Sequence, residues 1–342
     1  MMRVTISRNG PAAVTYYTEA LSKEDYFFRE KTVDAKWQGL TARILGIEGQ
    51  TVTKGVFSDL VQNIHPITKS RLTVRNNSER RAGYEYCFNS PKSASILYAL
   101  TGDQAIIEAH REGVRQAMAA IEKDMMTQAN QGRRKIYQPT GNLLYASFEH
   151  LVTRPVEYEK DHTKRYIPDC HIHSHAFVPN VTWVENKNRF QALEEGNIRR
   201  QAPYYEAIYH AVYSRALAKA GYEIVRTAER WEIKGADSKA LRDKFSNRTL
   251  EIEALAKTKG ITDQKGRSAL GARTRVKKGK GIGEEKLSAL WKDRLSEKEY
   301  TALKNAKGES PTQTKGIRVK DAVDHSLNHW LERLSAPQEK RV

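Results

Sequence analysis

The sequence is poor in cysteine and in long apolar runs. Only two cysteines occur in 342 residues, which excludes a disulfide-stapled scaffold and favours a reducing compartment. No run of 18 apolar residues is present, so we expect no membrane-spanning helix. The first residues lack the apolar core of a secretion signal, so we expect no secretion by that route. A phosphate-binding P-loop is also missing, because the glycines of residues 278–286 have the wrong spacing.

Acidic residues are outnumbered by basic ones. The chain carries 58 Lys and Arg against 41 Asp and Glu, a formal net charge of +17. This excess predicts a polyanionic partner, most simply nucleic acid. The alternative is a basic protein whose lysines are merely solvated. The length corresponds to one large or two ordinary domains.

Strand and helix patterns alternate along the chain. Residues 83–89, 141–153 and 171–182 mix alternation with β-branched or aromatic residues and predict strands. Residues 92–128 predict two helices separated at Gly102 and Asp103, because apolar residues recur at helical spacing. We further expect short helices over 31–65, a helix over 201–220, a hairpin from 222–226 and 230–234, and a charged helix over 236–256. The mixture predicts an α+β or α/β fold.

One segment is too basic and too rich in glycine to bury a core. Residues 264–283 contain seven Lys or Arg, five Gly and no acid, which predicts a flexible basic loop. We therefore expect a division into a domain over 1–262, the basic loop over 263–283, and a helical C-terminal part over 284–342.

Histidines are concentrated in one strand-like segment. Three of the ten fall at positions 171, 173 and 175, and because side chains alternate along a strand, all three would share one face. His150 lies on the preceding strand-like segment and reaches the same place if the two strands pair antiparallel. Neutral imidazoles are good metal ligands. The density of histidines favours a metal site over the alternative, an exposed polar strand face.

A second cluster consists of tyrosines near the N-terminus, Tyr16, Tyr17 and Tyr26. A phenol with a pKa near 10 is a poor nucleophile at neutral pH. It becomes useful when a metal ion polarises a phosphate in front of it, or when a neighbouring base takes its proton. The alternative is that these rings pack in the core or stack on DNA, and without the histidines we would favour that alternative.

Together these residues resemble the relaxase domain of conjugative plasmids, MobF class, in the HUH endonuclease superfamily. The resemblance implies an α+β fold, with an antiparallel sheet of the palm-like, RRM-like type flanked by helices and a helical C-terminal extension. The motifs that carry it follow one another along most of the chain. They are the tyrosine pair with the aromatic cluster at 26–28, residues 83–93, 140–142, 148–150, 153–154 and 169–182, the helix over 204–220 with Gly221 and Tyr222, and residues 245–248.

The resemblance implies a ligand set. His150, His173 and His175 fall on the family's metal triad, whereas His171 falls on a variable position. A rival register that uses His171 with His173 stays open. The family resemblance points to Mg or Mn as the working ion, while imidazole ligands alone would favour Zn, Ni or Cu, and the choice stays open.

The resemblance also implies catalytic roles. Tyr16 falls on the family's nucleophile within the pair that Tyr17 completes, and Tyr26 falls on the tyrosine that serves a second strand transfer. The family has Asp where this chain has Glu85, which we expect to orient a ligand histidine or to accept the tyrosine proton. Residues 156–168 are longer than usual for the family, and we expect them to form a charged surface loop.

The implied activity is metal-assisted nicking and strand transfer at a plasmid origin of transfer, with the protein joined to the 5′ end through a phosphotyrosine. Family members recognise a DNA hairpin and the adjoining single strand. The implied partners are accessory proteins of the relaxosome and the coupling protein of a type IV secretion system. The implied location is the bacterial cytoplasm, with translocation to the recipient cell together with the DNA. Five basic residues are candidate phosphate contacts: Arg75, Arg80, Arg81, Lys92 and Arg154.

Three alternatives remain at this point. One is a rolling-circle replication initiator of the same superfamily, another is a non-catalytic DNA-binding protein that contains a metal, and a third is a zinc hydrolase. Residues 322–333 look like the start of the helicase region in long family members. We therefore expect an N-terminal fragment of a larger protein, with a short natural relaxase as the alternative.

Overall fold

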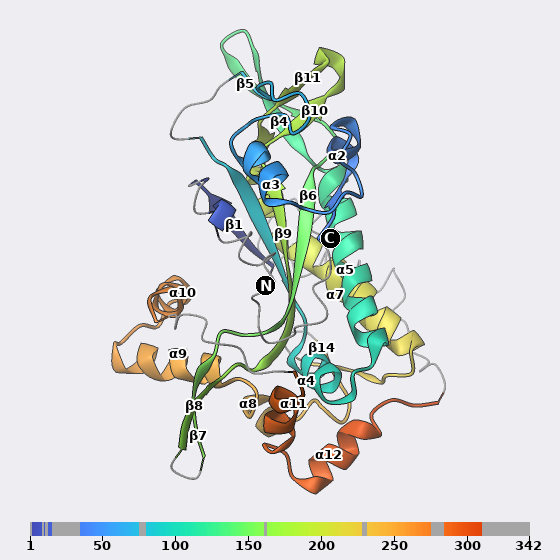
Figure 1. Ribbon diagram of the computed structural model, residues 1–342, viewed down its shortest axis with the longest axis vertical. Helices are drawn as coiled ribbons and strands as arrows, with labels where there is room; N and C mark the ends of the chain where they lie inside the picture. Colours follow the sequence, from blue (N-terminus) through green and yellow to red (C-terminus); the bar gives the residue numbers. More distant parts are fainter. Residues whose placement is uncertain are drawn as a thin grey trace, which may run out of the picture.

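A five-stranded antiparallel sheet forms the centre of the computed structural model, which describes residues 2–8, 10, 13–15, 35–74, 80–160, 163–227, 231–274 and 284–309 (Figure 1). Every pairing within this sheet is antiparallel. The α+β class is thereby confirmed. In spatial order the strands are β1 (Arg3–Ser7), β3 (Gly83–Asn89), β9 (Cys170–Pro179), β6 (Tyr145–Val152) and β2 (Trp37–Gln38).

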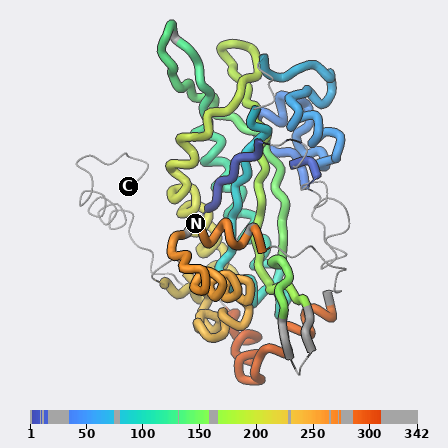
Figure 2. Tube along the Cα trace, turned by 90° about the vertical axis from the view of Figure 1, so that its left-hand side faces the viewer, coloured from blue at the N-terminus to red at the C-terminus, as the bar shows by residue number. Residues whose placement is uncertain are grey.

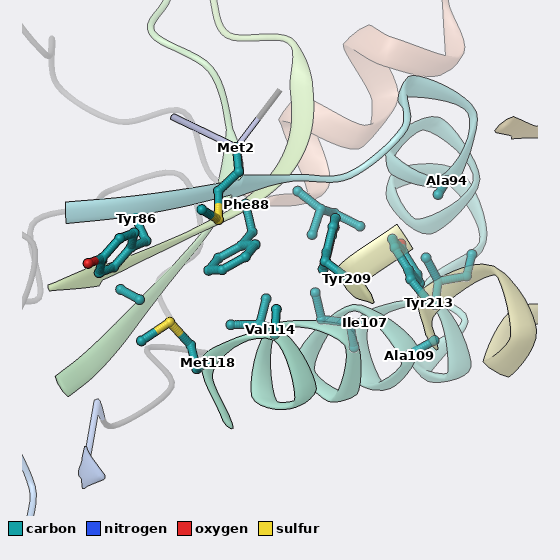
Figure 3. Close-up of a cluster of buried hydrophobic side chains, with 14 of the residues drawn as sticks. Met2, Tyr86, Phe88, Ala94, Ile107, Ala109, Val114, Met118, Tyr209 and Tyr213 are labelled. Atoms are coloured by element: carbon teal, nitrogen blue, oxygen red, sulfur yellow. The ribbon is translucent and has the colours of Figure 1, made fainter. Parts of the chain in front are cut away.

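Two long helices cover one face of the sheet, α5 (Gln104–Lys123) and α7 (Ala202–Lys219). Asp103 begins α5 by accepting a hydrogen bond from the main-chain N–H of Ala105. Gly113 lets the two helices approach, since a Cβ there would lie 2.9 Å from the carbonyl oxygen of Tyr209. Their apolar faces and the aromatic side chains of β3 form the larger core, as the close-up in Figure 3 shows for Phe88, Val114 and Tyr209.

A second, smaller core covers part of the opposite face. It lies under α2 (Leu40–Ile44) and α3 (Lys54–Val61), whose Phe57 packs against Phe148 and Phe177 of the sheet with ring centroids 6.3 and 4.9 Å away. In the turned view of Figure 2, the strands run between α5 and α7 on one side and α2 and α3 on the other. The smaller core therefore occupies one end of that face.

The remaining elements surround the sheet. They are α4 (Lys92–Thr101), the β4 (Met126–Gln131) and β5 (Arg134–Pro139) hairpin with β12 (Leu193–Glu194), β10 (Thr182–Val184), η1 (Glu185–Lys187), β11 (Arg189–Gln191), β7 (Val156–Lys160), β8 (Thr163–Ile167), α6 (Gly196–Arg200), β13 (Ile224–Arg226), β14 (Trp231–Ile233), α8 (Lys239–Asp243), α9 (Asn247–Thr258), α10 (Gln264–Arg273), α11 (Glu284–Lys292) and α12 (Glu297–Lys304). No helix in the described part of the chain is long and apolar enough to cross a membrane.

Three expectations about local structure are wrong. Residues 156–160 and 163–167 are two paired strands, β7 and β8, rather than a loop, because they continue the ends of the paired strands β6 and β9. The helix expected over 236–256 is two helices, since Ser238 caps α8 and α9 begins separately at Asn247. The expected basic loop is helical over Gln264–Arg273, where Asp263 caps α10 by accepting from the N–H of Gly266, and residues 275–283 lie outside the described residues.

The described C-terminal helices share the larger core. Leu287, Trp291 and Leu303 are buried in it, and the Trp291 indole N–H donates to the carbonyl oxygen of Pro168 at 2.9 Å. Arg294 forms a buried ion pair with Asp169 at 2.7 Å. Helices α11 and α12 are thus anchored beside the start of β9. The expected division into domains stays a prediction.

Candidate metal centre

The candidate histidines gather on one face of three neighbouring strands. In the sheet register His173 of β9 stands opposite His150 of β6 on one side and Asn89 of β3 on the other. His175 stands opposite Cys87 of β3. Directly opposed residues of antiparallel strands point to the same face. The expected antiparallel approach of His150 is therefore confirmed.

Four imidazole rings lie side by side on this face. The ring centroid of His173 is 5.2 Å from that of His150, 5.1 Å from that of His175 and 4.9 Å from that of His171. His150 and His175 are 5.4 Å apart. The structure thus brings together the three expected ligands and also the variable-position histidine.

Oxygen atoms lie close to Nδ1 of two of the rings. The Nδ1–H of His173 donates to the carbonyl oxygen of His171 at 3.0 Å, and Nδ1 of His175 lies 3.0 Å from the Glu85 carboxylate. The contact at Nδ1 of His173 fixes its tautomer and leaves the Nε2 lone pair at the far edge of the ring, as is usual for histidines that bind metals, and the Glu85 contact holds the His175 ring by its Nδ1 edge. Glu85 therefore lies where an orienting carboxylate was expected.

His171 is held differently from its neighbours. Its Nε2 lies 3.2 Å from the side-chain oxygen of Asn89. The same oxygen accepts a hydrogen bond from the Cys87 thiol at 3.7 Å. The His171 nitrogen that corresponds to Nε2 of His173 thus faces an amide oxygen of β3. This contact favours the register that uses His150, His173 and His175 over the rival register.

Burial and neighbours set the protonation of the rings. Burial lowers the pKa of His173 well below its usual value, and the adjacent imidazoles of His171, His175 and His150 lower it further, so this ring is neutral. Burial also lowers the pKa of His175, but hydrogen bonds and charges from Cys87 and Glu85 outweigh it and raise the pKa to about 10. A cation bound there competes with that proton.

The donor set suits a cation, although the side chains are not already arranged around one point. Within the described ranges, no group of three or more His, Cys, Asp or Glu residues is positioned so that it could hold a metal ion without adjustment. The observations that fit a cation are a half-buried neutral imidazole, His173, with its Nδ1 satisfied, and the imidazoles of His150 and His175, whose ring centroids lie within 5.5 Å of that of His173 and of each other. Binding at His150, His173 and His175 requires these rings to turn.

The expected phosphate contacts differ in what they do in the fold. Arg80 donates to the carbonyl oxygens of Val61 and Asn180 at 3.1 and 3.2 Å, so it joins the end of α3 to the end of β9. Lys92 donates to the carbonyl oxygens of Cys170 and Phe245 at 3.0 and 2.9 Å. The guanidinium of Arg80 and the ammonium of Lys92 are thus already engaged by main-chain oxygens.

The other expected site residues are more accessible or fall outside the described part. Arg81 is exposed and its guanidinium lies 3.5 Å from the Tyr84 hydroxyl. Arg154 is half-buried at the base of the β7–β8 hairpin. The candidates that lie outside the described residues are Tyr16, Tyr17, Tyr26 and Arg75.

One polar side chain behind the site was missed by the sequence reasoning. His110 of α5 is fully buried and hydrogen-bonded to Ser174 of β9 at 2.8 Å, on the face opposite the other histidines. The available signal was a histidine in the apolar stripe of a helix, three residues after Ile107 and four before Val114.

Comparisons with known proteins agree on one family. The family model described as TrwC relaxase matches residues 11–298. The "Multifunctional conjugation protein TraI" of Escherichia coli strain K12 is 26% identical over an alignment of 342 positions that covers 95% of this chain and 18% of that protein. A second Escherichia coli protein of the same name is 25% identical, with the same coverage. The chain thus spans about a fifth of the length of these relatives.

Solved structures show the same fold. A metal-bound structure of the conjugative relaxase TrwC in complex with oriT DNA has a TM-score of 0.72 and 23% identity, over 86% of this chain and 97% of that chain. TrwC in complex with a 27-mer DNA that comprises the recognition hairpin and the cleavage site has a TM-score of 0.70 and 23% identity, over 88% and 99%.

Proposed function

The chain belongs to the TrwC relaxase family, and from this premise we propose that it nicks and rejoins single-stranded DNA at the origin of transfer of a conjugative element. The observation that carries the proposal is the register of β6 and β9, which places His150, His173 and His175 on one face with their rings about 5 Å apart. Relatives named as conjugation proteins or as relaxases bound to oriT DNA support the same activity.

A divalent cation is the cofactor that we propose for the three imidazoles. The metal-bound and copper-bound structures of TrwC support this choice. When bound, the cation neutralises and polarises the non-bridging oxygens of a phosphate. Three neutral ligands leave the charge of the cation uncompensated, which suits an anionic substrate. Mg or Mn is proposed as the working ion by family resemblance, and Zn or Ni remains the choice that imidazole chemistry alone favours.

The proposed reaction is a transesterification with a tyrosine nucleophile. The phenol oxygen of Tyr16 attacks phosphorus in line, a new O–P bond forms, and the bond to the 3′ oxygen breaks. The phenol loses one proton and the departing 3′ hydroxyl gains one, so the step is balanced. The product is a 5′-phosphotyrosine that a free 3′ hydroxyl reverses. We propose Tyr17 and Tyr26 as further tyrosines of the site, with Tyr26 serving a second strand transfer.

The chain's own residues have supporting roles in this proposal. Glu85 is proposed to hold the His175 ring through its contact with Nδ1. Arg81 and Arg154, with Arg75 outside the described residues, are the proposed phosphate contacts. Arg80 and Lys92 are proposed to act mainly by holding the main chain around the site, since both already donate to carbonyl oxygens.

The wider context follows from the family. We propose a DNA hairpin with its adjoining single strand as the substrate, and relaxosome accessory proteins and a secretion coupling protein as partners. We propose action in the bacterial cytoplasm, with passage to the recipient cell together with the DNA. The alignment covers only 18% of the length of the curated relatives. We therefore also propose that this chain belongs to a longer protein, with a domain over residues 1–262, a segment over 263–283 and a helical part over 284–342.

A cleavage assay tests the proposal. The protein is incubated with single-stranded oligonucleotides from candidate origins of transfer, with Mg²⁺ or Mn²⁺, and the products are resolved under denaturing conditions. We expect a protein–DNA adduct that His173→Ala abolishes while DNA binding persists, and that the control His171→Ala retains. Absence of any adduct, with DNA binding intact, would favour a non-catalytic DNA-binding protein.

A further inference from the structure

Helix α5 contacts strand β9 on the sheet face opposite the one that carries His173 and His175. The ring of His110 is hydrogen-bonded through Nε2 to the Ser174 hydroxyl at 2.8 Å and through Nδ1 to the Tyr209 hydroxyl at 2.7 Å. Ser174 lies between His173 and His175 in the chain and points to the opposite face, toward the helices. Any shift of Ser174 therefore moves the main chain of both histidines.

The next residue of α5 holds the neighbouring strand. Arg111 makes two hydrogen bonds to the Glu149 carboxylate, at 2.8 and 2.9 Å. Glu149 directly precedes His150 on β6, and its side chain is only 10% exposed. Glu149 and Ser174 are also direct partners in the β6–β9 register. Two consecutive residues of one helix thus hold two opposed residues of the strands that carry the histidines.

We propose that His110 and Arg111 act as positioning residues. They fix where β6 and β9 lie relative to each other and to α5 at the metal site. This inference rests on the proposed function, in which the histidines bind a cation. Burial of a polar imidazole in a largely apolar core is costly, and apolar side chains would fill the same space. Hydrogen bonds are directional and fix the position of a strand, whereas apolar contacts allow it to slide. Partners hydrogen-bonded directly to ligand side chains typically change metal affinity 10- to 100-fold, and His110 and Arg111, which act through residues adjacent to the ligands in the chain, should have an effect at or below the lower end of that range.

A set of variants separates positioning from stability. In the triple variant His110→Leu, Ser174→Ala and Tyr209→Phe, all three partners become apolar together, so no buried polar group is left unsatisfied and the melting temperature should stay near that of the wild type. The contact between Arg111 and Glu149 is tested by Arg111→Gln. The Arg111 side chain is 45% exposed, so the variant should fold. The matched control is Arg115→Gln, whose partner Glu112 lies on the same helix.

The readout is Co²⁺ binding to the full chain, measured as a dissociation constant and as the ligand-field absorption of the bound ion. We expect the triple variant and Arg111→Gln to bind Co²⁺ more weakly by up to about 10-fold with a changed absorption band, and Arg115→Gln to match the wild type. Wild-type affinity and absorption in folded Arg111→Gln would overturn the inference, whether or not the triple variant folds. Co²⁺ binding that is equal in wild type and His173→Ala would overturn the proposed metal site together with this inference.

Discussion

His150 on β6 stands directly opposite His173 on β9, with ring planes inclined by 25° and ring centroids 5.2 Å apart. The two residues are 23 positions apart in the chain, so sheet pairing rather than local sequence brings them together. A slip of one residue in this register would move the His150 side chain to the helical face. The relationship therefore makes the register of β6 and β9 the structural basis of the candidate site.

The ligand set can be tested one histidine at a time. We expect His173→Ala to abolish specific binding of Mn²⁺ or Co²⁺, because its neutral ring lies centrally among the other three. His171→Ala should retain affinity within a few-fold, since its Nε2 faces Asn89. Isothermal titration calorimetry measures both. Equal losses in the two variants would support the rival register instead.

The orienting carboxylate should be replaceable only by another carboxylate. We expect Glu85→Ala to weaken metal binding about 10- to 100-fold, because the Nδ1 contact of His175 is lost. Glu85→Asp should lose less, as it keeps an acceptor of the same charge one methylene further away. The control is Glu157→Gln on β7. Metal affinity that is unchanged in Glu85→Ala would contradict the orienting role.

The buried ion pair beside β9 predicts a large loss of stability. Asp169 is fully buried and accepts hydrogen bonds from Arg294 and from the main chain and side chain of Asn247 at 2.7, 2.8 and 2.9 Å. Asp169→Asn leaves the buried Arg294 charge uncompensated, which typically costs about 3–5 kcal/mol. Urea denaturation measures this change. The control is Arg115→Gln, which breaks the exposed ion pair with Glu112 and should change the free energy of unfolding by about 1 kcal/mol or less. A similarly small change in Asp169→Asn would show that the pair is unimportant.

Glu195 predicts a pH dependence of stability. Its side chain is buried, and burial raises its pKa to about 7, with the nearby Glu194 raising it further against the influence of Arg199. Because the folded pKa lies above the unfolded value of about 4.3, the folded state binds more protons between these values. The contribution of protonated Glu195 to the free energy of unfolding is therefore fully present below about pH 4 and is lost as the pH rises to about 7.

The variant Glu195→Gln removes this titration. We expect it to be more stable than the wild type at pH 8 by about 3 kcal/mol, with the difference shrinking toward pH 5. Thermal unfolding of both proteins at several pH values provides the comparison. A difference that is independent of pH would mean that Glu195 does not titrate in this range.

Patterns with a clear period predicted the structure well. The alternation of residues 171–175 predicted the strand and its histidine face, and the break at Gly102 and Asp103 separates α4 from α5 as expected, since Gly102 has a positive φ of 67°. Side-chain periodicity depends on short-range geometry, so such segments are readable from the chain alone. The hairpin over 222–226 and 230–234 was also confirmed.

Features that depend on distant contacts were not predictable. The charged segment around Glu157 and Tyr166 forms a hairpin because it extends two strands that are already paired. The role of Lys92 is decided by carbonyl oxygens 78 and 153 positions away. His110 meets Ser174 only because α5 packs across β9. The hairpin and the Lys92 contacts leave no local signal in the sequence, and for His110 the one signal was its place in the apolar stripe of a helix.

The most direct test of the central claim is the identity of the residue joined to DNA. Purified protein is incubated with an origin oligonucleotide and Mg²⁺ or Mn²⁺, the adduct is digested with protease and nuclease, and the linked peptide is identified by mass spectrometry. We predict a 5′-phosphate on Tyr16, loss of the adduct in Tyr16→Phe, and its persistence in Tyr17→Phe. An adduct that persists in Tyr16→Phe, or a link to any residue other than a tyrosine, would contradict the account.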